Sequence, residues 1–164
     1  MVVVYLQKEL LYIMKLIKEI HFEHYDSLTT LPTNDRDLVK SATQSSANAY
    51  APYSNFKVGA AARLSSGEII AAANCESEVF PSGMCAERSL LYFIASNYAH
   101  QRIEALAITS SPSKRECYPC GACRQTLLDA ENRQDAPIRI IMAGAESATV
   151  VESAQTLLPF TFKL

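Results

Sequence analysis

Two short cysteine motifs in the sequence could bind one metal ion and act on water beside it. Cys85 is followed two positions later by Glu87, and Cys120 and Cys123 lie three positions apart further along the chain. Zinc with three protein ligands keeps a fourth position open for water, which is typical of catalytic and not of structural sites. A carboxylate that is not a ligand could carry protons to and from that water. We therefore predict one catalytic zinc ion per chain, with Cys85, Cys120 and Cys123 as ligands and Glu87 as general acid and base.

A helix is expected to begin at each motif, and this would favour metal binding. A helix N-terminus carries partial positive charge, which stabilises a thiolate over a thiol. Three thiolates would, however, offset the charge of the zinc and weaken it as a Lewis acid. Arg88 and Arg124 each directly follow a site residue, so they could restore the balance by donating to sulfur. The alternative is that both arginines form surface ion pairs.

The composition is that of a globular domain acting on a small molecule. The chain has 164 residues, of which 49% are apolar and 20% charged, and its formal net charge is −2. Lysine and arginine are scattered without a basic run, which argues against a nucleic-acid partner. No stretch reaches the roughly 20 apolar residues of a membrane span, so we expect no membrane partner.

The cysteine content indicates a reducing compartment. There are five cysteines, an odd number, and they cluster in short motifs, whereas a secreted disulfide framework uses an even number. The apolar N-terminal run is soon interrupted by Lys8 and Glu9 and lacks the basic segment of a signal peptide. We therefore expect a cytoplasmic protein.

Apolar periodicity and turn residues predict alternating helices and strands. The turn Ser65-Ser66-Gly67 separates two strands of a hairpin. The order predicts an α/β fold, a three-layer α/β/α arrangement with a mixed central sheet. Helices are expected over residues 33–50, 85–97 and 121–131, strands over 56–64, 69–73, 103–109 and 138–143, a short strand at 150–151 and a brief helix at 153–158.

The chain divides into an N-terminal extension, residues 1–33, and a catalytic domain, residues 34–164. Within the extension, residues 6–20 could be helical and residues 20–24 alternate like a strand. Met14 could be a translation start, which would make residues 1–13 an upstream addition. Thr33 or Asn34 could cap the first helix of the catalytic domain with its side chain.

Four motifs together resemble the cytidine deaminase family, in particular its short, all-cysteine, homotetrameric class. The resemblance runs from about residue 37 to residue 162. The motifs are the block at residues 49–61, the Asn74-Cys75-Glu76 segment before the first zinc cysteine, the zinc motif at residues 119–125, and the closing Leu157-Leu158-Pro159 with Phe162.

The resemblance implies a cytidine deaminase-like fold and the hydrolytic deamination of cytidine and 2′-deoxycytidine to uridine and 2′-deoxyuridine, a step of pyrimidine salvage. Glu87 would pass a proton from water to a ring nitrogen and then protonate the leaving amine. A nucleoside suits the polar pair of Asn74 and Glu76, because a free base would leave it unsatisfied. The implied substrate contacts are Phe56 on the pyrimidine, Asn74 and Glu76 on the ribose hydroxyls, the backbone of Ala86 on the base, and Phe162 in the pocket of a neighbouring subunit of a homotetramer.

Three alternatives stay open at this point. A deaminase of the same fold could act on blasticidin S or on a free base, and Glu78 and Phe80 depart from the family pattern in the loop before Cys85. Cys117 could instead supply a fourth sulfur to a structural, non-catalytic zinc module. A thioredoxin-like redox protein is the weakest alternative, because it leaves Cys85 and Glu87 unexplained.

Overall fold

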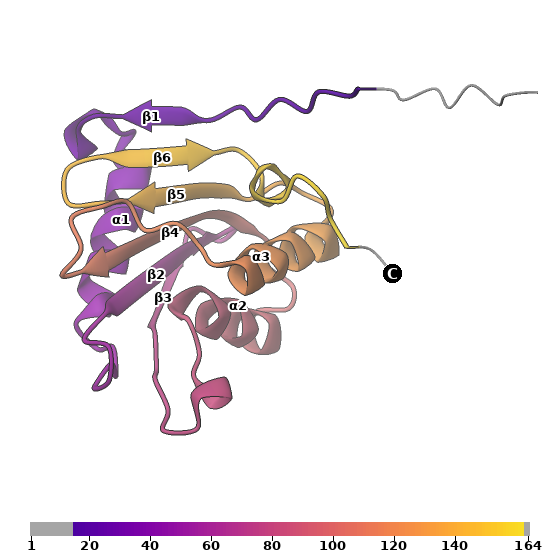
Figure 1. Cartoon of the computed structure of the whole chain (residues 1–164). Coiled ribbons are helices and arrows are strands. Elements are labelled where there is room, and N and C mark those ends of the chain that lie inside the picture. Colours follow the sequence, from indigo (N-terminus) through magenta and orange to yellow (C-terminus); the bar gives the residue numbers. More distant parts are fainter. Residues whose placement is uncertain (1–14, 163–164) are drawn as a thin grey trace, which may run out of the picture.

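A mixed six-stranded sheet forms the centre of the protein. The computed structural model describes residues 15–162, and the strands follow the order β1-β6-β5-β4-β2-β3 (Figure 1). Only β4 and β5 run parallel, and the other neighbouring strands are antiparallel. The bounds are β1 Glu23–Tyr25, β2 Lys57–Leu64, β3 Ile69–Ala73, β4 Ile103–Ser111, β5 Arg139–Ala143 and β6 Ala148–Val151.

Helices cover both faces of the sheet, which confirms the predicted three-layer α/β/α fold (Figure 1). Helix α1 (Thr33–Ser46) packs on one face, and α2 (Ala86–Asn97) and α3 (Gly121–Gln134) pack on the other. Three single-turn 3₁₀ helices complete the described elements, at Leu28–Thr30, Phe80–Ser82 and Ala154–Leu157.

Strand alternation divides the buried side chains between two cores. On β4, Leu106 and Ile108 face α2 and α3, whereas the small Ala105 and Ala107 face α1. Small residues beneath α1 let this helix approach the sheet closely. A Cβ atom at Gly59 of β2 would lie 1.9 Å from the carbonyl oxygen of Ala42, so the contact requires glycine at this position.

The first catalytic-domain helix begins and ends differently from the prediction. Pro32 occupies the cap position of α1 and no side chain caps the helix, so the predicted capping role of Thr33 or Asn34 is wrong. Pro32 has the non-helical dihedrals of a cap residue, φ −52° and ψ 146°, but its side chain has no acceptor for the first N–H groups of the helix. The helix ends at Ser46, before the predicted residue 50.

The described part of the N-terminal extension contributes an edge strand. Residues 23–25 form β1, which pairs antiparallel with β6 (Figure 1). Residues 15–20 have no helix, contrary to the prediction, and Leu16 and Ile17 are 84% and 90% exposed. A short helix without a packing surface is marginal in water, which explains the difference. The proposed start at Met14 and the rest of the predicted helix lie outside the described residues.

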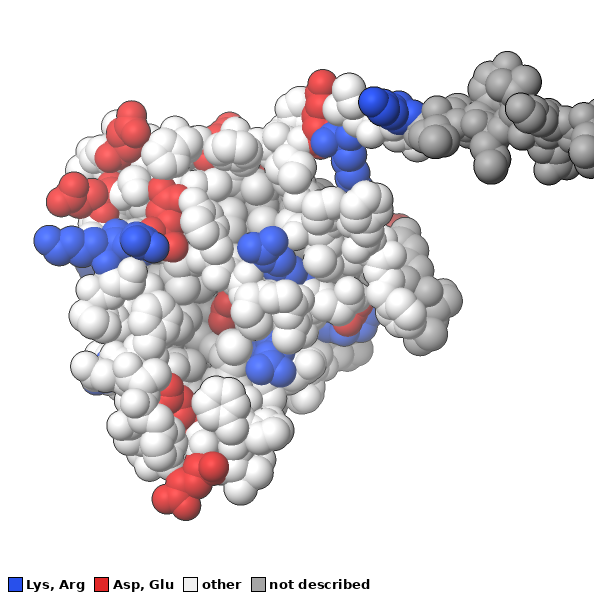
Figure 2. Space-filling view, viewed as in Figure 1, with Lys and Arg blue, Asp and Glu red and all other residues white. Residues whose placement is uncertain are grey.

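The surface is mixed in charge over the face seen in Figure 2. Lysine and arginine side chains lie singly or in small groups among acidic and neutral residues, without a continuous basic area on this face. Within residues 15–162, no helix combines the length and the apolar character needed to cross a membrane.

Candidate active site

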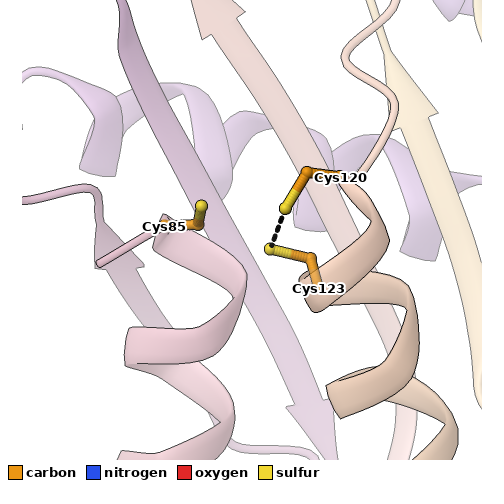
Figure 3. Close-up of side chains that lie close together, drawn as sticks. All are labelled: Cys85, Cys120 and Cys123. Atoms are coloured by element: carbon orange, nitrogen blue, oxygen red, sulfur yellow. Dashed lines mark hydrogen bonds between the residues drawn. The ribbon is translucent and has the colours of Figure 1, made fainter. Parts of the chain in front are cut away.

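Three cysteine side chains converge where α2 and α3 begin. Cys85 is the residue before α2, Cys120 is the residue before α3, and Cys123 lies in the first turn of α3. Their Sγ atoms all lie within 4.8 Å of one another, and those of Cys120 and Cys123 are 3.4 Å apart (Figure 3). The structure therefore brings together the three sulfurs that the sequence predicted as ligands.

The donor set fits a zinc ion. Three sulfurs at the start of two helices are soft ligands in a positive local field, and three protein ligands leave a coordination position for water. Cys117 lies outside this group of sulfurs. Burial raises the pKa of its thiol to about 11, so it stays protonated at neutral pH.

The cysteine cluster favours one thiolate even before a metal binds. The neighbouring Cys123 thiol, with support from the Arg88 guanidinium, lowers the pKa of Cys85 to about 5. The proximity of Cys85 in turn raises the pKa of Cys123, which keeps its proton. Metal binding must displace the remaining thiol protons, because a zinc ligand is a thiolate.

The two arginines near the cysteines have different roles. Arg88 Nη2 lies 3.8 Å from Cys85 Sγ and donates to it, which confirms the predicted contact. Arg124 instead donates through Nε to the carbonyl oxygen of Pro119 at 2.9 Å and through Nη1 to that of Leu157 at 3.3 Å. The prediction that Arg124 donates to sulfur is therefore wrong, because its guanidinium group instead contacts the loop before α3 and the 3₁₀ helix Ala154–Leu157.

Glu87 is a buried carboxyl group beside the cysteine cluster. It lies in the first turn of α2, and only 4% of its surface is exposed. Burial is the main cause that raises the pKa of this carboxyl, and the negative charge on Cys85 adds to it. A carboxyl group in this environment can hold and release a proton nearer neutral pH than an exposed one.

A cavity of about 490 Å³ borders this cluster. Cys85, Cys120 and Glu87 contribute to its lining, together with Phe56, Asn74 and Glu76, so six residues predicted from the sequence share one cavity. Phe56 is 42% exposed, which leaves ring surface free for a flat ligand. A cavity of several hundred cubic ångströms is large enough for a small organic ligand.

Asn74 holds the start of strand β2. Its Oδ1 accepts from the N–H of Val58 at 2.7 Å, and its Nδ2 donates to the carbonyl oxygen of Phe56 at 3.0 Å. A side-chain amide offers two lone pairs and two N–H donors. One of each is therefore left for a ligand in the cavity.

Glu76 holds the loop before Phe56. One of its carboxylate oxygens accepts from the N–H groups of Tyr53, at 2.9 Å, and Ser54, at 3.2 Å, and the other accepts from the Ser54 hydroxyl. The hydroxyl bond is the main cause that lowers the pKa of this carboxyl. A carboxylate has about four acceptor positions, so Glu76 can still accept from a ligand hydroxyl.

The two remaining predicted residues lie differently. Ala86 is fully buried and begins α2, so its N–H is one of those a helix leaves without an intrahelical partner. Phe162 is 69% exposed and does not contribute to the cavity lining. Its predicted role therefore requires another subunit.

Several lining residues were missing from the sequence analysis as site residues. Some of them, such as Tyr53 and Val58, lie in the motif block at residues 49–61 without an assigned contact, and the others lie in the loop before α2, in α2 or in the loop before α3. They include Tyr53, Ser54, Val58, Ser77, Pro81, Gly83, Met84, Arg88 and Tyr118.

The sequence matches a known family over the segment that builds this site. The family model described as "Cytidine and deoxycytidylate deaminase zinc-binding region" matches residues 32–135. The chain belongs to this family. The match confirms the resemblance seen in the motifs, and with the three-cysteine cluster it gives the chain one zinc ion as cofactor.

Individual relatives agree with the family. A cytidine deaminase from Halalkalibacterium halodurans is 40% identical over 92 residues, which cover 56% of this chain and 68% of the relative. A cytidine deaminase from Mycobacterium tuberculosis is 35% identical over 113 residues, which cover 66% of this chain and 84% of the relative.

Solved structures of this family share the fold. The cytidine deaminase of Burkholderia pseudomallei superposes with a TM-score of 0.66 at 32% identity, covering 77% of this chain and 97% of that structure. That of Mycobacterium tuberculosis also gives 0.66, at 31% identity, covering 81% and 100%. The cytidine deaminase-like α/β fold is thus confirmed.

Proposed function

We propose that the protein catalyses the hydrolytic deamination of cytidine and 2′-deoxycytidine to uridine and 2′-deoxyuridine, with release of ammonia. The observation that carries this proposal is the convergence of three cysteine sulfurs beside the buried carboxyl group of Glu87, on one cavity. Family membership and the activity named for the relatives support it.

Cys85, Cys120 and Cys123 would hold the zinc ion. When bound, zinc supplies Lewis acidity that makes water nucleophilic near neutral pH. Arg88 would limit the charge that Cys85 places on the metal, because it donates to that sulfur.

Glu87 would move the protons of the reaction. Its buried carboxylate would take a proton from the attacking water and deliver it to the ring nitrogen, while oxygen adds to the amine-bearing carbon. The same group would take the second proton of that oxygen and give it to the leaving amine. The carbon–nitrogen bond then breaks, ammonia leaves, and a carbonyl group remains.

The other predicted residues would bind and orient the nucleoside. Phe56 would pack on the pyrimidine with its exposed ring, and the free N–H of Ala86 would hold the base. Asn74 and Glu76 would use their remaining hydrogen-bonding positions for the ribose hydroxyls, which favours a nucleoside over a free base.

We further propose a homotetramer in which Phe162 closes the cavity of a neighbouring subunit. The exposure of Phe162 and Phe160, at 69% and 92%, supports a partner surface near the C-terminal end of the described chain. Sedimentation analysis of the purified protein tests the assembly, and a fully active monomer would contradict it.

The cellular role would be pyrimidine salvage in the cytoplasm. Free thiol groups on all five cysteines, three of them needed as metal ligands, support a reducing compartment.

The chain would divide between residues 33 and 34 into the N-terminal extension and the catalytic domain. Strand β1 of the extension would then be an added strand on the sheet of the catalytic domain.

Ammonia release from a panel of substrates tests the proposed function. Cytidine and deoxycytidine should both be deaminated at similar efficiency, while cytosine, guanine and blasticidin S should not be. A strong chelator should abolish the activity and added zinc should restore it. Preference for cytosine or blasticidin S would overturn the substrate assignment, and activity unaffected by complete zinc removal would overturn the mechanism.

A further inference from the structure

Glu116 is a buried carboxylate in the loop that joins β4 to α3. Its side chain is 8% exposed. Thr149 of β6 donates to one of its oxygens at 2.6 Å, and Ser147 donates to the other at 2.8 Å. Burial opposes ionisation, but these hydrogen bonds outweigh it and lower the pKa of Glu116, so it is a fixed negative charge within the loop that ends at Cys120.

Tyr118 connects this carboxylate with the catalytic cavity. Its hydroxyl donates to Glu116 and lies 3.3 Å from Thr149 Oγ1, while the residue contributes to the cavity lining together with Cys120. The side chain is therefore held at its polar end, and 55% of the residue remains exposed. A tyrosine fixed in this way presents a preset apolar surface to a ligand.

The N-terminal strand reaches the same carboxylate. In the β1–β6 pairing, His24 lies directly opposite Thr149. His24 Nδ1 is 3.5 Å from Glu116 and 3.4 Å from Thr149 Oγ1. His24 precedes the segment matched by the family model, which begins at residue 32.

We infer that Tyr118 contacts the bound nucleoside and that Glu116 and His24 are positioning residues for it. This inference rests on the proposed function, since it assigns a further residue to the same site. It also gives the N-terminal strand a role in substrate binding, because His24 supports the carboxylate that holds the tyrosine.

The size of the expected effects follows from the contacts. Loss of an aromatic contact with a flat ligand weakens binding by about three- to tenfold. Tyr118→Phe keeps the ring but removes the bond to Glu116, so we expect a rise in Kd of roughly twofold to fivefold. Glu116→Gln and His24→Ala should fall within the same range or below it.

The experiment measures the Kd of uridine by calorimetry, the KM and kcat for cytidine, and zinc per chain. Tyr118→Ala should raise Kd and KM with zinc content unchanged. Glu116→Gln should raise Kd in the wild-type background but add nothing in the Tyr118→Ala background, because it acts through the tyrosine. Glu104→Gln and His100→Ala serve as matched controls, since both residues are exposed and neither contributes to the cavity lining.

Each contrary result has a distinct meaning. Unchanged uridine binding by both Tyr118→Ala and Tyr118→Phe would overturn the contact, even if the wild type deaminates cytidine. Equal effects of Glu116→Gln in both backgrounds, or loss of zinc from this variant, would overturn its positioning role. A wild type that holds zinc but neither binds uridine nor deaminates cytidine would instead overturn the proposed function.

Discussion

Arg88, in the first turn of α2, donates to the sulfur of Cys85, the residue before that helix, with 3.8 Å between Nη2 and Sγ. Its Nε is buried and has no hydrogen-bond partner within residues 15–162. The guanidinium group contacts the sulfur of Cys85 through Nη2, and this contact draws negative charge from a thiolate at that position. This contact couples a residue that binds no metal to the electronic state of the site.

Arg88→Ala should therefore impair catalysis more than folding. Without the donor, Cys85 places more charge on the metal and weakens its Lewis acidity, and changes in such outer contacts cost about 10- to 100-fold in activity or metal affinity. Measurement of kcat and zinc per chain, with Arg133→Gln in the last turn of α3 as a control, checks this. An unchanged kcat at full zinc occupancy would contradict the role of Arg88.

Glu87→Gln should retain zinc and uridine binding but lose nearly all turnover. An amide of the same size cannot carry the protons, and general acid–base groups contribute typically ~10²–10⁴-fold. Single-turnover kinetics with cytidine measure the effect, and the exposed Glu104→Gln provides the matched control. Turnover within a factor of a few of wild type would mean that another group transfers the protons.

Cys117→Ser should keep one zinc per chain, whereas Cys85→Ala should lose both zinc and activity. Cys117 lies outside the sulfur group, and burial keeps it a thiol at neutral pH. Metal analysis of the two variants separates the catalytic site from a structural four-cysteine site. Loss of zinc from Cys117→Ser would favour the structural alternative.

Glu76→Ala should raise KM for cytidine and deoxycytidine together. The variant removes both the expected ribose contact and the bonds that Glu76 accepts from Tyr53 and Ser54. Glu76→Gln keeps one acceptor oxygen without the charge, so we expect a smaller rise in KM than for Glu76→Ala. Any residual action on free cytosine should stay the same, and an unchanged nucleoside KM in both variants would remove Glu76 from the ribose site.

Phe162→Ala should raise KM without changing the oligomer or the thermal unfolding temperature. The ring lies outside its own cavity, so its effect depends on a neighbouring subunit. Steady-state kinetics and sedimentation distinguish this from misfolding, with the exposed Phe22→Ala as the control. Full activity of Phe162→Ala would place the closing contact elsewhere.

Most of the fold could be predicted because local patterns specify it. The hairpin of β2 and β3 follows from two apolar runs on either side of the turn Ser65-Ser66-Gly67, and β3 has the predicted bounds. Helix α3 extends three residues beyond the predicted Glu131, to Gln134, whose side chain bonds the backbone of Ile103. That contact is long-range, so no local signal could reveal it.

The grouping of residues was predictable where spacing and chemistry coincide: the structure brings Cys85, Cys120 and Cys123 together and buries Glu87 close to them. Tyr118 could not be found in this way, since its place in the cavity depends on the path of a loop. The pairing of β1 with β6 was equally hidden, because a strand of three residues gains its stability from a partner far along the chain.

The carboxylate of Glu76 also bears on how fast a ligand can be captured. Because it accepts from the N–H groups of Tyr53 and Ser54, the turn that precedes Phe56 is held in one conformation by hydrogen bonds of the protein itself. The conformational entropy of this turn is lost when the protein folds. Ligand binding therefore does not have to order the turn, and this favours tighter binding. Association should then proceed as a single concentration-dependent phase, with little rearrangement of this wall.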